Sequence, residues 1–170
     1  MTLRKIYTHP HPVLREKAAK ITEFDDKLRQ LAKDMGETMY AAKGVGLAGN
    51  QIGLARQIIV VDISAHEDEQ RYLTLINPVI SEGEGSESDK EGCLSVAEYD
   101  AKVVRFKKIR VTAQDLEGNP LDFIAEARFA RIIQHEVDHL HGKLFIDRLS
   151  KLKQDMYKRK LKKILDKQEG

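Results

Sequence analysis

Apolar side chains recur at every third or fourth position in three segments of the chain, a spacing that indicates amphipathic helices. The first segment spans 25–40, where Asp25 or Asp26 can cap the N-terminus. The second spans 126–140 and is followed after one residue by a glycine suited to ending a helix. The third spans about 149–167 and has lysines on one side. Its other side carries Leu149, Leu152, Met156, Leu161, Ile164 and Leu165.

Between the first two helices the pattern alternates with a period of two, which indicates strands. The predicted strands are 57–62, 72–77, 102–106 and 108–114, with turn residues at Asn77-Pro78, Gly83-Glu84-Gly85 and Glu117-Gly118-Asn119-Pro120. We expect an α+β fold, with residues 1–170 forming a single domain. In it, small antiparallel sheets pack around the central helix, with an N-terminal helix and a C-terminal amphipathic helix beside them.

The central helix carries the strongest chemical signal, the segment Gln134-His135-Glu136-Val137-Asp138-His139-Leu140, which contains His-Glu-x-x-His. Since a helix turns about 100° per residue, His135 and His139 project from one face and can bind one metal ion. Glu136 points in a neighbouring direction, as a general base acting on metal-bound water would. A separate, apolar arc must pack into the core: Phe129, Ile133, Val137 and Leu140. The alternative is an ordinary helix with two exposed histidines.

A hydrolytic metal site needs a third protein ligand and an open fourth position. Cys93, the single cysteine of the chain, lies in Glu91-Gly92-Cys93-Leu94-Ser95 and is a candidate thiolate ligand. A single cysteine cannot form an internal disulfide. A lone cysteine is, however, also commonly a small core residue rather than a ligand. Other histidines compete for the role, although each fits a solvated loop or faces away: His9, His11, His66 and His141. Spacing alone leaves the choice open.

Together, the cysteine segment (91–95) and the histidine segment (134–140) resemble the peptide deformylase family. The glycine-rich segment Gly44-Val45-Gly46-Leu47-Ala48-Gly49-Asn50-Gln51 resembles a third motif of that family, and Pro12-Val13-Leu14-Arg15 resembles its N-terminal segment. The motifs occur in the order and spacing of the family over nearly the whole chain. The resemblance implies a hydrolase that removes the formyl group from N-formylmethionine at the start of newly synthesised polypeptides and releases formate.

Carried over residue by residue, the resemblance implies that Cys93, His135 and His139 hold the metal and that Glu136 is the general acid/base. It also implies that the Gln51 side chain and the backbone N–H of Leu94 stabilise the developing oxyanion. The family usually works with Fe(II), and the same ligands also suit Zn(II), Co(II) or Ni(II).

Further residues of these motifs are candidates for substrate binding. We expect Val45, Gly46 and Gly92 to hydrogen-bond an extended peptide in the manner of an added strand. Ile132 lies between His139 and Glu136 on the helical wheel, so it either forms part of a methionine pocket or simply packs in the core.

Three other positions bear on the resemblance. Gly49 stands where the family has alanine, and Ala97 stands where proline is frequent. Neither change removes a catalytic group, but both affect how the motifs are held. Arg105 matches a recurrent arginine of the family, and it either supports the site by pairing with Glu91 or lies on the surface.

Composition limits the partners. Charged residues make up 33% of the 170 residues, and no run approaches the roughly 18 to 20 apolar residues of a membrane-spanning helix. Residues 1–14 lack the pattern of a signal peptide. We therefore expect a cytoplasmic protein that uses neither a membrane nor DNA.

The C-terminal segment, 151–170, holds eight lysines and arginines against three acidic residues, whereas the rest of the chain has a net charge of −3. Such a segment can dock on an acidic surface such as ribosomal RNA, or it is the solvated face of a packed helix.

Two other functions fit parts of the pattern. A metallopeptidase would share His-Glu-x-x-His, but Cys93 and Gln51 argue against it. In a binding module based on the basic C-terminal helix, a structural metal would have four protein ligands, whereas only three good candidates are found.

Overall fold

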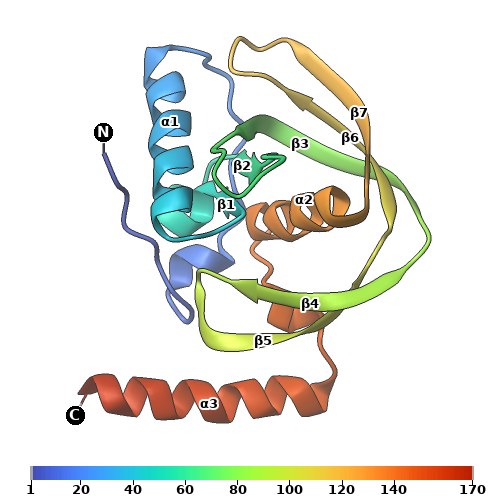
Figure 1. Ribbon diagram of the computed structural model, residues 1–170. Coiled ribbons are helices and arrows are strands. Elements are labelled where there is room, and N and C mark those ends of the chain that lie inside the picture. Colours follow the sequence, from blue (N-terminus) through green and yellow to red (C-terminus); the bar gives the residue numbers. More distant parts are fainter. Residues whose placement is uncertain (1, 170) are drawn as a thin grey trace.

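The computed structural model describes residues 2–169 and follows the chain through helices, a curved sheet and a hairpin (Figure 1). The helices are α1 (Asp26–Ala41), α2 (Ala127–Leu140) and α3 (Lys151–Glu169), with short 3-10 turns η1 (Pro12–Arg15), η2 (Gly49–Ile52) and η3 (Phe145–Arg148). The strands are β1 (Gly46–Ala48), β2 (Ile58–Asp62), β3 (Tyr72–Glu84), β4 (Glu87–Cys93), β5 (Val96–Arg105), β6 (Lys108–Gln114) and β7 (Pro120–Glu126).

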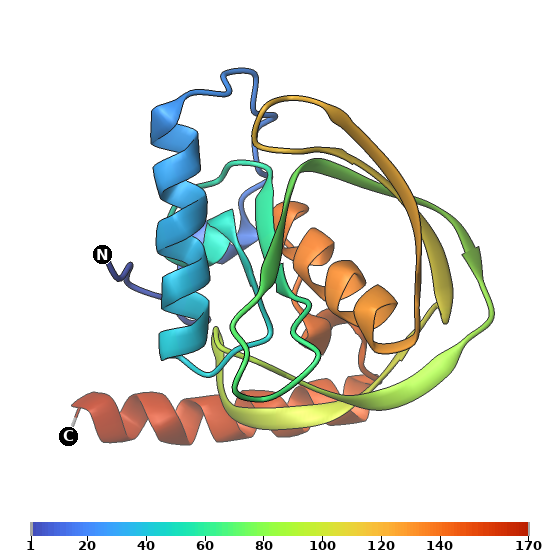
Figure 2. The same cartoon turned by 45° about the horizontal axis from the view of Figure 1, so that its top comes forward.

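The strands form two antiparallel sheets around α2. One is five-stranded in the order β1-β2-β3-β6-β7, and the other is the β4–β5 hairpin. Figures 1 and 2 show α2 in the centre, with the larger sheet curving around it and the hairpin on its other side. α1 covers the β1–β2 end, and α3 runs along the outside of the hairpin. The predicted α+β fold with a central helix is therefore confirmed.

The apolar arc of α2 fills the inside of the curved sheet. Ile133, Val137 and Leu140 are buried there, in a cluster that includes side chains of β2, β3, β6 and β7. Phe129 is half-buried and stacks on Phe123 of β7 with ring centroids 5.8 Å apart. Burying one large aliphatic side chain stabilises the fold by about 1.5–3 kcal/mol. This packing fixes the rotation of α2 and so decides which way its polar edge points.

α1 packs its own apolar stripe against the outer part of the sheet, as its spacing predicts. Its buried side chains include Leu28, Leu31, Met35 and Met39. The carboxylate of Asp25 accepts a hydrogen bond from the backbone N–H of Leu28 at 3.0 Å and caps the helix.

The predicted turn at Asn77-Pro78 was wrong, because β3 continues through it to Glu84. The residues form a bulge between Ile76 and Val79, with Asn77 at a φ of 53°. The Asn77 side chain accepts from the N–H of Ile21 and donates to its carbonyl, both at 2.8 Å. Residues of these types favour both turns and bulges. The sequence therefore could not distinguish a turn from this bulge, which links the N-terminal segment to the sheet.

The strands β1, β4 and β7 were not predicted, and β5 begins at Val96 rather than at 102. β4 is almost entirely polar and exposed, because it pairs with β5 outside the main sheet and buries little on either face. A strand of this kind lacks the alternation that sequence patterns detect.

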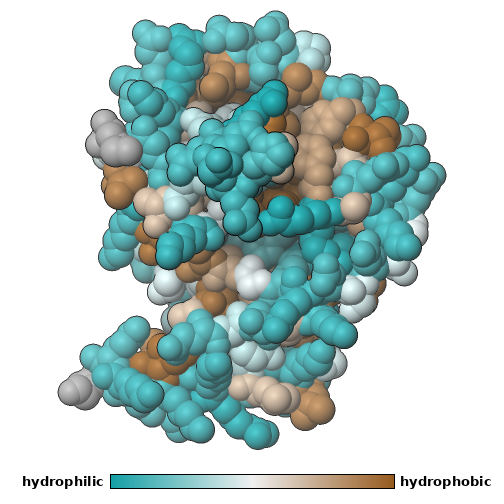
Figure 3. Space-filling view, viewed as in Figure 1, coloured by the Kyte–Doolittle hydropathy of each residue, from teal (hydrophilic) through white to brown (hydrophobic). Residues whose placement is uncertain are grey.

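α3 touches the body mainly through Tyr157, which is 2% exposed and lies 5.2 Å from the Tyr99 ring, centroid to centroid. Leu152 and Met156 of the predicted apolar side are 69% and 52% exposed. Figure 3 shows hydrophobic atoms on α3 among hydrophilic ones. Within residues 2–169, every helix is too short or too polar to cross a lipid bilayer.

Candidate metal centre

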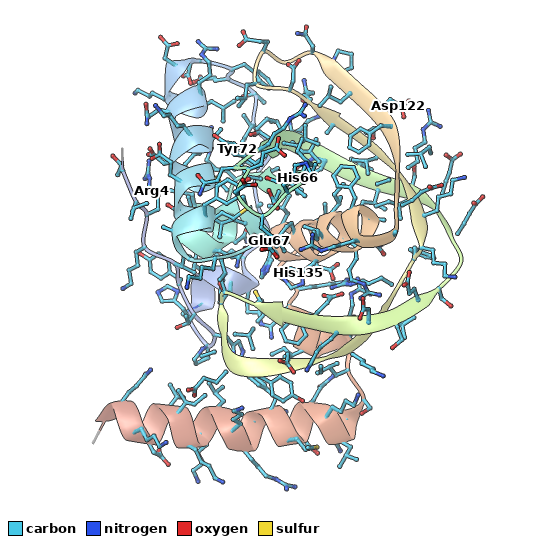
Figure 4. The ribbon with its side chains drawn as sticks, in the orientation of Figure 1. Arg4, His66, Glu67, Tyr72, Asp122 and His135 are labelled. Carbon is cyan, nitrogen blue, oxygen red and sulfur yellow. The ribbon has the colours of Figure 1, made fainter. Side chains whose placement is uncertain are left out.

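Two elements bring the candidate ligands together. His135 and His139 lie one turn apart on α2, and Cys93 ends β4, where the hairpin turns toward α2. One ligand atom from each of the three residues lies within 4.8 Å of the other two, and Cys93 Sγ is 3.4 Å from His139 Nε2. The two histidines are only 8% and 1% exposed, so the alternative of solvent-exposed histidines does not hold. In Figure 4 His135 lies between α2 and the hairpin.

The other histidines serve different purposes. His9 Nδ1 lies 2.8 Å from the Tyr157 hydroxyl, and His11 accepts from the N–H of Val13. His66 and His141 are exposed in loops. Among residues 2–169, Cys93, His135 and His139 form the one His/Cys/Asp/Glu cluster with metal-binding spacing.

The chemistry of the cluster fits a divalent metal ion. His135 directs Nδ1 to Glu91 at 2.8 Å, which leaves Nε2 for a metal, and ligating histidines usually donate their second N–H to a carboxylate in this way. Burial and the nearby His135 hold the pKa of His139 well below its ordinary value, so its ring is neutral and able to ligate. The buried Nδ1 of His139 has no hydrogen-bond partner among the described residues. Two imidazoles facing one thiol are a donor set that suits Fe(II), Zn(II), Co(II) or Ni(II).

Glu136 lies beside the cluster and is 4% exposed. Burial raises the pKa of Glu136 to about 7, so near neutral pH this carboxyl can both accept and return a proton. Gly46 of β1 faces it so closely that a Cβ at position 46 would lie 2.8 Å from Glu136 Cδ. The glycine therefore makes room for the carboxylate.

Gln51 directs its amide N–H groups toward the same place. Its Oε1 accepts from the N–H of Ala48 at 2.9 Å, which fixes the orientation of the amide. Its Nε2 then lies 3.1 Å from Ser95 Oγ and 3.6 Å from Cys93 Sγ. The side chain is 1% exposed, because η2 follows β1 directly into the interior. A donor held in this way needs no reorganisation when charge develops near it.

A cavity of about 660 Å³ opens beside the cluster. It is lined by every residue predicted for substrate binding: Val45, Gly46, Gly92 and Ile132. Gln51, Cys93, Leu94, His135 and Glu136 also line it. Within the described chain, β1 pairs only with β2 and β4 only with β5, so each strand has a free edge near the cavity. A free edge can pair with an extended peptide.

Arg105 lies in the interior and is not a surface arginine. It is 4% exposed and makes two 2.9 Å hydrogen bonds to Glu91, as one of the two predicted alternatives requires. Glu91 also accepts from Arg131 at 2.6 Å. Although burial alone would raise it, hydrogen bonds from Arg105 and His135 hold the pKa of Glu91 well below its ordinary value. Glu91 is thus a buried carboxylate that orients His135.

Sequence reasoning missed three polar residues around the centre: Arg131, Asp138 and Arg148. Arg131 and Asp138 lie on the polar arc of α2, a helix in which 11 residues are buried. Charged side chains on so buried a helix need ion-pair partners, and this is the signal that could have indicated them. Arg148 follows α2 in η3, and no local pattern indicates its contact with Asp138.

Gly49 packs closely against neighbouring backbone. A Cβ at this position would lie 2.7 Å from the carbonyl oxygens of Leu54 and Arg56. The backbone of the following loop therefore occupies the space of an alanine methyl. Ala97 lies exposed on β5.

Comparison with known proteins identifies the family. A family model described as polypeptide deformylase matches residues 3–155. The peptide deformylase of Desulfotalea psychrophila is 51% identical over 164 residues, which cover 96% of this chain and 97% of that protein. A solved peptide deformylase from Legionella pneumophila has a TM-score of 0.89 at 42% identity and covers 98% of both chains. A plant peptide deformylase has a TM-score of 0.92 at 35% identity, over 99% of this chain and 92% of that one. The chain therefore belongs to the peptide deformylase family.

Proposed function

We propose that this deformylase hydrolyses the formyl amide of N-formylmethionine on newly synthesised polypeptides at a metal held by Cys93, His135 and His139. The observation that carries the proposal is the position of this cluster at one cavity with Glu136 and Gln51. Removal of an N-formyl group is the activity of the family. Residues 1–170 are proposed to act as one domain, of which residues 2–169 are described.

The metal, when bound, supplies Lewis acidity that lowers the pKa of water and polarises the formyl oxygen. We propose Fe(II) as the native ion, with Zn(II), Co(II) or Ni(II) as substitutes. Metal analysis of protein purified without oxygen tests this choice.

Glu136 moves the proton in the proposed reaction. Its carboxylate accepts a proton from the attacking water and returns it to the amine that leaves as the C–N bond breaks, so that formate and a free N-terminus result. The pKa of about 7 suits both transfers. Gln51 Nε2 and the backbone N–H of Leu94 donate to the formyl oxygen as negative charge develops on it.

The cavity orients the substrate. The free edges beside Val45, Gly46 and Gly92 pair with an extended peptide, and Ile132 contributes an apolar wall for the methionine side chain. Ile132 is 8% exposed and also belongs to the core around α2, so core packing is one of its roles and the methionine wall is the role proposed here.

The test is formate release from a formyl-Met peptide by metal-loaded protein. Glu136→Gln should keep its metal and lose about 10²- to 10⁴-fold in kcat. Glu126→Gln, a matched change of an exposed glutamate at the start of the same helix, should keep its rate. A peptide without the formyl group is assayed in parallel, because a metallopeptidase would cleave it. Cleavage of internal bonds without formate release would reject the proposal.

We also propose that α3 brings the enzyme to the ribosome in the cytoplasm. α3 exposes a cluster of cations near its middle: Lys158, Arg159, Lys160, Lys162 and Lys163. Replacing Lys158, Lys160 and Lys163 with glutamine keeps Tyr157 in place and should weaken co-sedimentation with ribosomes at low salt. The same change at the exposed lysines 17, 20 and 33 should have no effect. Equal binding by both triple variants would contradict the docking role.

A further inference from the structure

Arg148 forms a two-point ion pair with the back of the metal-centre helix. It is the last residue of η3, and its Nε and Nη2 donate to the two carboxylate oxygens of Asp138 at 2.7 and 2.8 Å. Asp138 is 8% exposed, whereas the Arg148 side chain is 43% exposed. Paired hydrogen bonds of this kind fix direction as well as distance.

From Asp138 an unbroken series of ion pairs leads to His135. Arg105 Nη1 donates to Asp138 at 2.6 Å, while its Nε and Nη2 hold Glu91 at 2.9 Å. Glu91 Oε1 in turn lies 2.8 Å from His135 Nδ1. One guanidinium therefore divides its donors between two buried carboxylates, and one of these carboxylates orients the proposed metal ligand.

The charges show what Arg148 contributes. With Arg148 present, both oxygens of Asp138 have a cationic partner other than Arg105, so Arg105 can keep two of its donors on Glu91. Without Arg148, Asp138 would be a buried carboxylate with Arg105 as its only partner among the described residues. A buried charge that loses one partner interacts more strongly with the partner that remains, because it is otherwise uncompensated. Arg105 would then shift toward Asp138, and Glu91 would lose part of its hold on His135.

η3 is itself firmly held and touches His135 by a second route. The guanidinium of Arg15 donates to both oxygens of Asp147, at 2.6 and 3.1 Å. Phe145, at the start of η3, stacks near His135 with ring centroids 6.1 Å apart and an interplanar angle of 25°. Arg148 thus acts from a fixed support.

We propose that Arg148 is a positioning residue for His135, acting through Asp138, Arg105 and Glu91, and that it slows the release of the metal. The proposal rests on the proposed metal centre. Partners in direct contact with ligating histidines typically change metal affinity or activity by about 10- to 100-fold. Because three residues lie between Arg148 and His135 in this series of contacts, we expect a smaller effect, about 3- to 10-fold in the rate of metal loss.

The experiment compares Arg148→Met with Arg110→Met in cobalt-loaded protein. Arg110 is a matched control, since it is 42% exposed and also makes a two-point ion pair, with Asp122, but on β6 away from the cluster. The cobalt–thiolate absorption is followed while a chelator in excess removes the metal. Arg148→Met should lose cobalt about 3- to 10-fold faster than wild type, and Arg110→Met within 2-fold of wild type. Arg148→Lys, which keeps the charge but not the two-point contact, should be intermediate.

Each outcome decides between the alternatives. Equal rates for wild type, Arg148→Met and Arg148→Lys would overturn the positioning role. Equal acceleration by Arg148→Met and Arg110→Met would overturn it too, because both changes would then act through general stability. If Arg148→Met does not fold, Arg148→Lys alone is compared with Arg110→Lys by the same criteria. Failure of the wild type to take up one metal ion would instead refute the proposed centre, and this inference with it.

Discussion

Gly46→Ala tests whether the position of Glu136 matters for turnover. In ordinary packing a Cβ stays at least about 3.4 Å from its neighbours, whereas one at position 46 would lie 2.8 Å from Glu136 Cδ and 2.9 Å from Cγ. Glu136 is buried on a helix whose rotation is fixed by its core side. The carboxylate would therefore move by about 0.6 Å at Cδ, and farther at Oε2.

A displacement of this size has a calculable effect. Misplacing a catalytic group by about 1 Å can cost about 10²-fold in rate, so we expect kcat to fall by about 10- to 100-fold. That fall corresponds to about 1.4 to 2.7 kcal/mol in the activation free energy. The extra methyl also strains the packing, which should lower the free energy of unfolding by about 1–3 kcal/mol.

The assay measures kcat and KM separately with a formyl-Met peptide, at equal metal content. Blocking of the peptide by the new methyl would raise KM, whereas displacement of Glu136 lowers kcat. Gly92→Ala provides a comparison in the same cavity, because its Cβ would lie no closer than 3.8 Å to any residue other than its chain neighbours. Its loss in kcat should therefore be much smaller. A Gly46→Ala enzyme with wild-type kcat would show that the position of Glu136 does not limit turnover.

Three further changes test separate parts of the account. Gln51→Ala should lower kcat by about 10²- to 10³-fold at unchanged metal content, and a loss under 3-fold in steady-state assays would count against an oxyanion role. Because the pKa of Glu91 is held low, the stability that its ionised carboxylate gives to the fold is complete above about pH 4.5 and is lost as pH falls. In urea unfolding, the difference in unfolding free energy between wild type and Glu91→Gln should therefore narrow below that pH. A difference that stays constant with pH would contradict this role. Burial lowers the pKa of His9, whose Nδ1 lies 2.8 Å from the Tyr157 hydroxyl, so the neutral ring stabilises the docked α3 above about pH 6.5 and this stabilisation is lost as pH falls. Hydrogen exchange in α3 should rise below that pH in wild type beyond the intrinsic trend, but not in Tyr157→Phe.

The helices and the chemistry on α2 could be predicted because both depend on local periodicity. His135, Glu136 and His139 occupy positions that any α-helix would bring to one edge, and α2 needs only its buried arc to point that edge toward the cavity. The position of Cys93 relative to them depends on how the β4–β5 hairpin folds back, and here only the family resemblance supplied the expectation.

The remaining features depend on contacts between distant segments. Asn77 continues a strand instead of turning it because Ile21, 56 residues earlier, supplies partners for its side chain. α3 docks through Tyr157 because His9 and the hairpin meet it there, while apolar side chains such as Leu152 face outward. Periodicity reports which side of an element is apolar, but not what lies opposite it.

Cys93, His135 and His139 are proposed to hold a metal at which Glu136 promotes deformylation. The most direct measurement is the metal content of anaerobically prepared protein, together with its formate release, for wild type, Cys93→Ser and Glu136→Gln. We expect one metal ion and rapid formate release for wild type, weakened metal retention for Cys93→Ser, and one metal ion with almost no turnover for Glu136→Gln. A Cys93→Ser protein that retains its metal as tightly as wild type, or a Glu136→Gln protein with full turnover, would contradict these roles.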